Sequence, residues 1–436
     1  MKIPCSLTNT ENDQSNDKKR KNNKMKKEKV VQVCAGLANI LILTQSKKVY
    51  SIKINQDGDK SNKNGLSLID SKYFNNETVI QICCGHHHSM ALTQNGNVYS
   101  WGSNYYGQLG SGNQLNHEVP IRINPVCFGD QPIKFIDAGS FYSFASTKNN
   151  HLYSWGLNYG MLGLNSENES KPTLVDSKTY NNETIVKIQC GFYHTLLITK
   201  KSEDSTNVYS CGFNHHGELG LGHNSNKNTF ELIDPKHFAN QKIKDVKSGE
   251  YFSIALVEEN DSNKTKIYAW GNNAYGQLGL GDETNRCVPC EIDSLNFNDE
   301  EVVKIGNGAY HSFAITKEQG SNKTKVYAWG CNGSGQLCLG HFEQTKKPTS
   351  IDMGNFSSDK IIYTGVNCGS YKHSFAITKT GKLFVWGSNH KGELGLGHCE
   401  SVIIPQQFFP ELFGISMINE KIYNNSSFED VSVGFA

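Results

Sequence analysis

Two kinds of residue in this chain could bind a metal ion or carry out redox chemistry. Cys287 and Cys290 have the Cys-X-X-Cys spacing of redox and zinc sites, and the histidine runs 86–88 and 215–216 supply imidazoles. However, no second cysteine pair lies near Cys287, and adjacent residues of a strand point to opposite faces. The chain also shows no Gly-X-X-X-X-Gly-Lys phosphate loop and no Ser/His/Asp arrangement. We therefore expect no enzyme activity, no metal site and no cofactor.

A second set of side chains follows a glycine that recurs seven times along the chain. Two positions after that glycine stand His87, Phe141, Tyr193, Tyr251, Tyr310 and Tyr371. Tyr and Phe beside scattered charge are typical anchors of protein–protein interfaces, and Glu250 is the only acidic residue in these loops. We predict that all these residues form a partner-binding face. The alternative is that each ring packs over the adjacent repeat as scaffold, which its recurrence in most units favours.

The recurring glycine belongs to a repeat unit of about 50–60 residues, a length in the propeller range. Apolar and polar residues alternate with period two, and Asn, Gly, Ser and Lys fill the connectors, a pattern that indicates β-strands. All five tryptophans occupy one position of the unit: Trp101, Trp155, Trp270, Trp329 and Trp386. We predict an all-β fold over residues 30–436, a seven-bladed β-propeller with four short antiparallel strands per blade. The indoles should be buried between neighbouring blades, in a structural role.

The two ends of the predicted ring are irregular. The first unit lacks the Trp-Gly pair, and Val49-Tyr50-Ser51-Ile52 stands in its place. Residues 431–436 (Val-Ser-Val-Gly-Phe-Ala) resemble the opening of another unit. Because a closed ring removes free sheet edges, we expect the two ends to share one blade. A truncated chain is the alternative.

The near-neutral net charge of +1 hides a basic N-terminus. Residues 1–29 hold nine Lys or Arg and four acidic residues, with the cluster Lys18, Lys19, Arg20 and Lys21 at their centre. Because this segment has almost no apolar residues, we predict a disordered arm. Such a cluster is of the kind that nuclear-import receptors bind, and it would also make weak, non-specific contacts with nucleic-acid phosphates. The alternative is a tail that only adds solubility.

The composition also indicates a compartment. The longest uninterrupted apolar stretches, such as Ile40–Leu43, fall far short of the ~20 residues of a membrane-spanning helix. The N-terminus has no apolar signal core, and the 13 cysteines are an odd number scattered along strand-like segments. We expect an intracellular monomer with no membrane span, in the nucleus, the cytoplasm or both.

The repeat resembles that of the regulator of chromosome condensation (RCC1-type) family. The resemblance is carried by Cys-Gly-Phe-Tyr-His-Thr at 190–195, Asn-Gly-Ala-Tyr-His-Ser at 307–312 and Trp-Gly-Asn-Asn-Ala-Tyr-Gly-Gln-Leu-Gly-Leu-Gly at 270–281. Trp followed by Gly rather than Asp argues against WD repeats, and the absence of a Gly-Gly doublet argues against kelch repeats. The resemblance spans residues 30–436 and implies a seven-bladed propeller.

What the resemblance implies for function is less uniform, because one fold serves several activities. The founding member exchanges guanine nucleotide on the GTPase Ran through charged and His residues in the loops after the repeat glycine, where this chain has a single acid, Glu250. A light receptor of the family has Trp directly after that glycine, where this chain has Phe192, Glu250 or Ala309. Ubiquitin ligases of the family carry a catalytic domain beyond the propeller. We therefore expect a protein-binding scaffold, with nucleotide exchange on a Ran-like small GTPase as the alternative.

Overall fold

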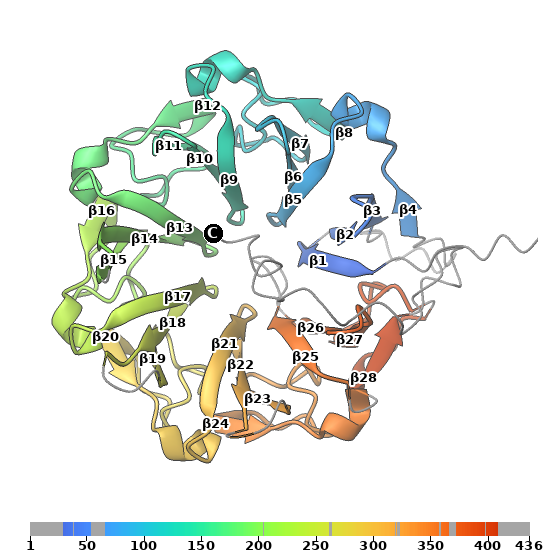
Figure 1. Ribbon diagram of the computed structural model, residues 1–436, viewed down its shortest axis with the longest axis vertical. Coiled ribbons are helices and arrows are strands. Elements are labelled where there is room, and N and C mark those ends of the chain that lie inside the picture. Colours follow the sequence, from blue (N-terminus) through green and yellow to red (C-terminus); the bar gives the residue numbers. More distant parts are fainter. Residues whose placement is uncertain are drawn as a thin grey trace, which may run out of the picture.

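The molecule is a ring of seven sheets around one central axis (Figure 1). The computed structural model describes residues 29–408, except 38, 54–65, 204, 261–263, 319, 321–322, 357–358, 366–371 and 397. Each sheet, or blade, contains four antiparallel strands that follow one another in the sequence from the axis to the rim. The prediction of a seven-bladed β-propeller is confirmed.

The first three blades contain strands β1 to β12. Blade 1 consists of β1 (Val30–Ala35), β2 (Asn39–Thr44), β3 (Val49–Lys53) and β4 (Leu66–Leu68). Blade 2 consists of β5 (Val79–Cys84), β6 (His88–Thr93), β7 (Val98–Gly102) and β8 (His117–Arg122). Blade 3 consists of β9 (Ile133–Ala138), β10 (Tyr142–Thr147), β11 (Leu152–Gly156) and β12 (Glu169–Leu174).

The other four blades contain strands β13 to β28. Blade 4 consists of β13 (Thr184–Cys190), β14 (His194–Ser202), β15 (Ser205–Gly212) and β16 (Lys227–Leu232). Blade 5 consists of β17 (Lys242–Ser248), β18 (Phe252–Glu258), β19 (Thr265–Gly271) and β20 (Arg286–Glu291). Blade 6 consists of β21 (Glu301–Asn307), β22 (His311–Lys317), β23 (Thr324–Gly330) and β24 (Thr345–Ser350). Blade 7 consists of β25 (Ile361–Gly365), β26 (His373–Thr378), β27 (Leu383–Gly387) and β28 (Val402–Phe408).

Strand position in a blade decides which residues the sequence places there. The second strands are buried along their whole length in blades 2, 3 and 7, so small and apolar residues fill them. The fourth strands form the outer edge and contain Pro120, Pro172, Pro289, Pro348 and Pro405. Proline suits an edge because its missing N–H removes no ladder hydrogen bond there.

Short 3-10 turns connect six pairs of consecutive blades, a feature that the sequence analysis did not predict. They are η1 (Ser71–Phe74), η2 (Pro125–Phe128), η3 (Ser177–Tyr180), η4 (Pro235–Phe238), η5 (Ser294–Phe297) and η6 (Met353–Phe356). In η1 to η5 an Asp or Asn cap accepts a hydrogen bond from the backbone of the turn. The last aromatic residue of each turn is buried, and Phe297, for example, packs edge-on against Trp329. The described residues contain no helix long and apolar enough to cross a membrane.

The five tryptophans lie in the third strands and are buried, with exposed fractions of 7% for Trp101 and 0% for the others. Trp155 Nε1 donates a hydrogen bond to the Gln108 carbonyl of the preceding blade at 2.9 Å. Trp270, Trp329 and Trp386 make the equivalent bond, at 2.8–2.9 Å. Each of these four indoles therefore joins its own blade to the preceding one through both apolar contact and a hydrogen bond.

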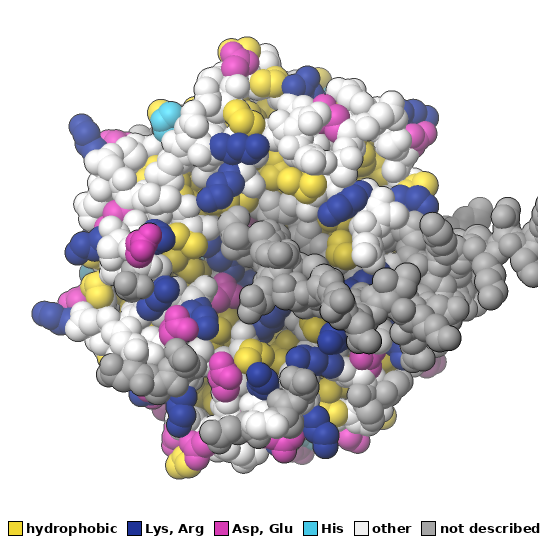
Figure 2. All heavy atoms as spheres, viewed as in Figure 1, with side chains coloured by type: hydrophobic (Ala, Val, Ile, Leu, Met, Phe, Trp, Pro, Cys, Tyr) yellow, Lys and Arg dark blue, Asp and Glu magenta, His cyan; other side chains and the backbone are white. Residues whose placement is uncertain are grey.

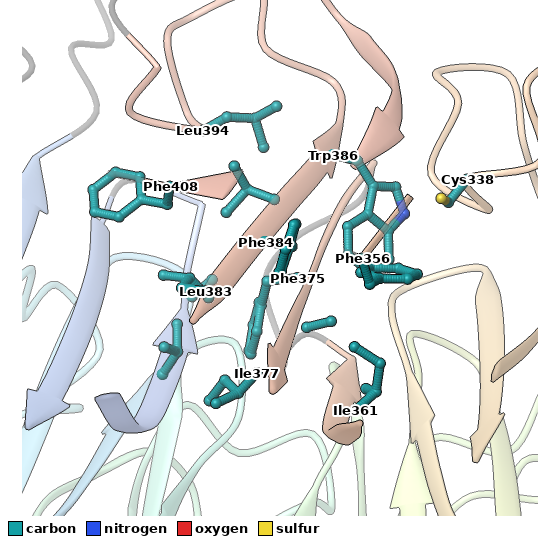
Figure 3. Close-up of a cluster of buried hydrophobic side chains, with 14 of the residues drawn as sticks. Cys338, Phe356, Ile361, Phe375, Ile377, Leu383, Phe384, Trp386, Leu394 and Phe408 are labelled. Carbon is teal, nitrogen blue, oxygen red and sulfur yellow. The ribbon is translucent and has the colours of Figure 1, made fainter. Parts of the chain in front are cut away.

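The ring closes at a seam between blade 7 and blade 1. The expectation that the chain ends share one blade is wrong for the described residues, because each of the seven sheets is built from four consecutive strands. Residues 431–436 lie outside the described residues. The seam is apolar: Phe408, Leu394 and Leu383 of the last unit face blade 1 (Figure 3), where they join Ile42 and Ile52 in one cluster.

Ile52 occupies at this seam the position that Trp has in other blades. It pairs with Ile40 across β2 and β3, as Trp329 pairs with Ser312 in blade 6. The smaller side chain leaves a small void, lined among others by Val33, Ile52 and Phe375. The seam thus lacks the indole hydrogen bond that four other junctions have. Lys29, assigned to the arm in the sequence analysis, is buried here, with 5% exposed.

Candidate partner-binding face

The loops that carry the predicted partner-binding residues lie on one face of the ring. In a four-stranded antiparallel meander, the connections from strand 1 to 2 and from strand 3 to 4 leave at the same end. The predicted aromatic residues stand in or directly after the first of these connections. The 3-10 turns, which join each fourth strand to the next blade, lie at the opposite end.

Backbone hydrogen bonds tie neighbouring loops of this face to one another. His86 N donates to the Ser140 carbonyl at 3.0 Å, Phe192 N to that of Gly249 at 3.2 Å, and Glu250 N to that of Ala309 at 3.0 Å. Each of these bonds joins two consecutive blades. The side chains of the loops are therefore held in fixed positions around the ring.

Four of the predicted residues, linked by His86 and Phe192, which were not predicted, form a series of ring contacts from blade 2 to blade 5. The His87 and Phe141 rings lie 6.2 Å apart between centroids, and Phe141 contacts His86 at 5.3 Å. His86 packs against Phe192 at 4.2 Å, and Phe192 contacts Tyr193 at 4.4 Å. Tyr193 then stacks on Tyr251 at 5.7 Å with an interplanar angle of 26°. Residues far apart in sequence thereby form one aromatic surface.

A second row of rings, missed in the sequence analysis, lies over the first. These rings come from the loops between the third and fourth strands: Tyr106, Tyr159, Phe213, His216 and Tyr275. Four of the five stand close to a ring of the first row, at 5.3–5.4 Å in Tyr106–Phe141, Phe213–Tyr193, His216–Tyr251 and Tyr275–Tyr310. Tyr159 instead contacts Phe213 of its own row at 6.0 Å. The signal was available, because four of the five directly precede the first glycine of the Gly-X-Leu-type turn.

The two rows differ in exposure. First-row residues His87, Phe141, Tyr193, Tyr251 and Tyr310 are partly buried. In the second row, Tyr159 is 56% exposed, Tyr275 41% and Tyr106 38%. We call the two rows together the aromatic face. Tyr371, the last predicted member, lies outside the described residues.

The histidines that follow the first row are structural. His88, His194 and His311 are fully buried, and each Nε2 lies 2.8–2.9 Å from a serine hydroxyl of the next blade. Burial lowers the pKa of each to about 3, so these imidazoles are neutral near pH 7. The repeat glycine makes room for the ring: a Cβ at Gly308 would lie 2.1 Å from His311 Cε1.

The residues that could have bound a metal are dispersed. Among the described residues, no group of three or more His, Cys, Asp or Glu could hold a metal ion. Cys287 and Cys290 are partly buried free thiols on the edge strand β20. His86 is buried among aromatic rings, and burial lowers its pKa to about 3.

Two carboxyl groups are buried beneath the aromatic face at blades 4 and 5. Glu250, in the loop after β17, is 6% exposed, and Glu218, in the loop after β15, is fully buried. Burial raises the pKa of Glu250, an effect that hydrogen bonds from Tyr310 and Tyr251 partly offset. Burial also raises the pKa of Glu218 to about 7. Both carboxyl groups raise the pKa of Tyr251, after the effect of its own burial.

The predicted basic arm, with Lys18, Lys19, Arg20 and Lys21, lies outside the described residues. Figure 2 shows one face of the ring, on which Lys and Arg side chains are spread among Asp and Glu. On the described part of that face the two signs of charge are interspersed.

Comparison with known proteins identifies the family of the chain. Residues 6–371 match the family model of the RCC1-like domain, and residues 363–393 and 380–418 match models of the regulator of chromosome condensation (RCC1) repeat. The chain belongs to the RCC1-like domain family.

Curated relatives of this RCC1-like propeller have varied functions. The chain is 29% identical over 309 residues to the ultraviolet-B receptor UVR8 of Arabidopsis thaliana, covering 70% of this chain and 64% of the relative. It is 30% identical to the secretion-regulating guanine nucleotide exchange factor of Bos taurus, with 62% and 54% covered. It is 33% identical to the probable E3 ubiquitin-protein ligase HERC4 of Mus musculus, with 50% and 19% covered. The chain thus spans between about a fifth and about two thirds of these relatives.

Solved structures share the fold. Prp20p of Saccharomyces cerevisiae, whose structure was reported with its binding to Gsp1p and histones, matches with a TM-score of 0.66 at 19% identity, covering 88% of this chain and 86% of that one. Human WBSCR16 matches with a TM-score of 0.62 at 21% identity, covering 79% and 87%. At these identities the similarity establishes the RCC1-like propeller fold but not the function. The function has to be inferred from the residues of the aromatic face.

Proposed function

We propose that this RCC1-like propeller is a non-enzymatic scaffold that binds a protein partner through the aromatic face. The observation that carries the proposal is the double row of rings, in which partly buried rings lie against exposed ones: Tyr310 contacts the exposed Tyr275, and Tyr193 reaches the exposed Tyr159 through Phe213. Scaffold packing accounts for the buried row but gives no reason for large exposed phenols above it. Tyrosine is enriched at interface hot spots because it combines apolar area with a polar tip.

The rigidity of the face supports the same proposal. The inter-loop bonds from Phe192 N and Glu250 N fix the backbone beneath the rings. A surface that is already ordered loses less conformational entropy when a partner binds. The rings therefore form a preorganised surface that a partner would bind without rearrangement.

The test is a triple variant, Tyr193→Ala, Tyr251→Ala and Tyr310→Ala, in the full-length chain. Proteins captured from cells by immobilised wild type and variant are quantified, and the candidate partner is then purified and titrated against both. We expect the variant to lose capture and to weaken the purified complex at least about 100-fold, as loss of several hot-spot rings does.

A matched control keeps this test specific. Val126 in η2 and Leu295 in η5 are 66% and 68% exposed on the opposite face, so a Val126→Ala, Leu295→Ala variant removes exposed apolar area elsewhere. It should capture the partner as the wild type does. If the tyrosine variant binds equally well, or if it fails to fold while single Tyr159→Ala and Tyr275→Ala variants bind normally, the proposal is wrong.

Guanine-nucleotide exchange on a Ran-like small GTPase is the second candidate. It is favoured by the similarity to the bovine exchange factor and by the fold shared with Prp20p. We would assign the exchange activity to Glu250, the single acidic residue of the loops that follow the repeat glycine. Release of labelled GDP from purified Ran, with wild type and with Glu250→Gln, tests it: exchange requires an acceleration over spontaneous release that the variant reduces.

For the N-terminal arm, we propose that Lys18–Lys21 direct nuclear import and make weak contacts with nucleic acid. For the whole protein, we propose a monomer in the nucleus, the cytoplasm or both. The support is the basic composition of residues 1–29. A fluorescent fusion without residues 1–29 should shift from nucleus to cytoplasm, and an unchanged distribution would refute the import role. Light scattering of the purified protein measures its oligomeric state.

A further inference from the structure

Two buried carboxyl groups of the aromatic face each have one oxygen atom without a hydrogen-bond partner. Glu218 Oε2 accepts a hydrogen bond from His216 N at 2.8 Å, but its Oε1 has none, and neither has Glu250 Oε2. Among the described residues, no Lys, Arg or His forms an ion pair with either carboxylate. Buried charged groups are normally paired, so an unpaired carboxylate oxygen in a surface loop is a place where a cationic group of a ligand can bind.

Comparison with the other blades shows that the fold does not require a carboxylate at position 218. Blades 2, 5 and 6 have Gln108, Gln277 and Gln336 there, and each accepts the same loop hydrogen bond at 2.9 Å. In blade 5, Gln277 Nε2 also donates to Asn272 Oδ1 at 2.7 Å. Blade 4 has Phe213 at the position of Asn272, so no side-chain donor stands there for Glu218 Oε1.

The aromatic rings next to Glu250 complete the environment of a cation site. Tyr251 follows Glu250 directly in the sequence and stacks on Tyr193, and Glu250 N donates to the carbonyl of Ala309, the residue before Tyr310. Interaction with the Tyr310 and Tyr251 hydroxyls lowers the pKa of Glu250, against the larger effect of burial. The electrostatic influence of Glu250 extends to Tyr193, on the neighbouring blade. Aromatic ring faces attract cations, and a carboxylate among them supplies the opposite charge.

We propose that Glu250, with Tyr193, Tyr251 and Tyr310 around it and Glu218 beneath, binds a cationic side chain, arginine or lysine, of the protein partner. Glu250 makes the direct contact, because a small part of it is exposed. Glu218 is fully buried, and because its pKa is about 7 it adds to the negative potential in the part of the population in which its carboxyl group is ionised. This inference rests on the proposed function, because it assigns the chemistry of the partner residue that the aromatic face would bind.

The test uses short peptides of the form acetyl-Gly-Gly-X-Gly-Gly-amide, where X is arginine, lysine, citrulline or norleucine. Citrulline keeps the shape of arginine without its charge, and norleucine keeps the alkyl chain of lysine. Binding is followed by NMR shifts of isotopically labelled tyrosine rings in the full-length protein. We expect saturable shifts with arginine or lysine, and binding at least about 10-fold weaker with the neutral analogues.

Variants assign the effect to the carboxylates. Glu250→Gln should weaken the arginine or lysine peptide at least about 10-fold, and Glu218→Gln should weaken it less, because it acts at longer range. Glu218→Gln introduces the residue that three other blades contain, so it should fold, and thermal melting checks both variants. Equal binding of citrulline and arginine, or unchanged binding by folded Glu250→Gln and Glu218→Gln, would overturn the inference.

Failure of this inference can be told apart from failure of the proposed function. If Glu250→Gln still captures the protein partner and the tyrosine triple variant does not, the aromatic face binds a partner through apolar contacts and the cation site is wrong. If the triple variant also captures the partner, the partner binds elsewhere and the proposed function itself is wrong.

Discussion

His194 Nε2 of blade 4 and Ser253 Oγ of blade 5 lie 2.8 Å apart in the buried space between the two blades. Ser253 Oγ in turn donates to the Glu218 carbonyl at 3.0 Å, and the same carbonyl accepts from Trp270 Nε1 at 2.9 Å. Because the serine proton goes to the carbonyl, the histidine carries its proton on Nε2 and donates it to the serine. One carbonyl, one serine, one histidine and one indole thus connect the two blades.

This network predicts unequal costs for removing its members. Ser253→Ala leaves the buried His194 N–H unpaired and should cost about 1–3 kcal/mol of unfolding free energy. His194→Phe should cost only about 1 kcal/mol, because Phe252 fills the same position in blade 5 and Ser253 keeps its carbonyl partner. In the double variant the unpaired donor is gone, so the two losses should not add. Urea unfolding of the four proteins measures this coupling, and strict additivity would contradict the network.

Loss of the indoles should destabilise the ring according to their hydrogen bonds. Trp270→Ala should cost about 3–5 kcal/mol, because it empties a fully buried position and removes the bond to the Glu218 carbonyl. Replacement by Phe isolates the contribution of the indole N–H. Trp270→Phe should cost more than Trp101→Phe, because Trp270 Nε1 donates to the Glu218 carbonyl, whereas no described carbonyl of blade 1 accepts a hydrogen bond from Trp101. Calorimetric melting of the two Phe variants compares them directly, and equal losses would show that the indole N–H contributes nothing.

Stability should fall in mildly acidic solution. The pKa of His88, His194 and His311 is about 3 in the folded protein, whereas an unfolded histidine titrates near ~6.5. Between these values only the unfolded chain binds the protons, so each histidine lowers stability by about 1.4 kcal/mol per pH unit as the pH falls. Urea unfolding at pH 7, 6 and 5 should therefore show a smaller loss for His194→Phe than for the wild type.

Glu218 should act in the opposite direction. Its pKa of about 7 in the folded protein lies above the usual value of a glutamate, so between the two values the folded state keeps a proton that the unfolded state releases. That stabilisation is present at low pH and is lost as the pH rises toward 7. Glu218→Gln should accordingly lose more stability than the wild type between pH 7 and 5, and an equal loss would place the carboxyl group in a solvated environment with an ordinary pKa.

The seam between blades 7 and 1 should open before the junctions that an indole closes. It has Ile52 in place of the indole and a small void beside it. Hydrogen exchange followed by mass spectrometry should show faster exchange in β2 and β27 than in β18 and β22, which lie at junctions closed by Trp270 and Trp329. Uniform protection around the ring would mean that apolar packing alone closes the seam as firmly as an indole does.

Much of the fold could be predicted from sequence because each blade repeats the same local constraints. Trp before Gly, proline in the outer strand and glycine beside the buried histidine each reflect one physical requirement that recurs around the ring. The 3-10 turns also had a signal, an Asp or Asn four residues before a buried aromatic such as Phe74, but a single turn of helix is too short for periodicity to reveal. The way in which the ring closes could not be predicted. The strand-like pattern at 431–436 does not indicate whether these residues pair with a strand of any sheet.

The candidate site was predicted only in part, for a related reason. Position within the repeat identified Tyr193 and Tyr251 as equivalent, but not that their rings stack across two blades. Glu250 was recognised by its charge, whereas its burial and its relation to Glu218 depend on loops that are far apart in sequence. The repeat pattern predicts the structure within a unit, but it does not predict which side chains of different units contact one another.

Because every blade is one uninterrupted stretch of chain, the architecture bears on how proteins of this kind can change size during evolution. Duplicating the gene segment for a single unit would insert a whole new sheet without splitting an existing one, and deleting a segment would remove one equally cleanly. All junctions, including the seam at Ile52 and Phe408, would then have to adjust to a ring of different circumference. A propeller in which one blade contains strands from both ends of the chain could not gain or lose its terminal units in this way.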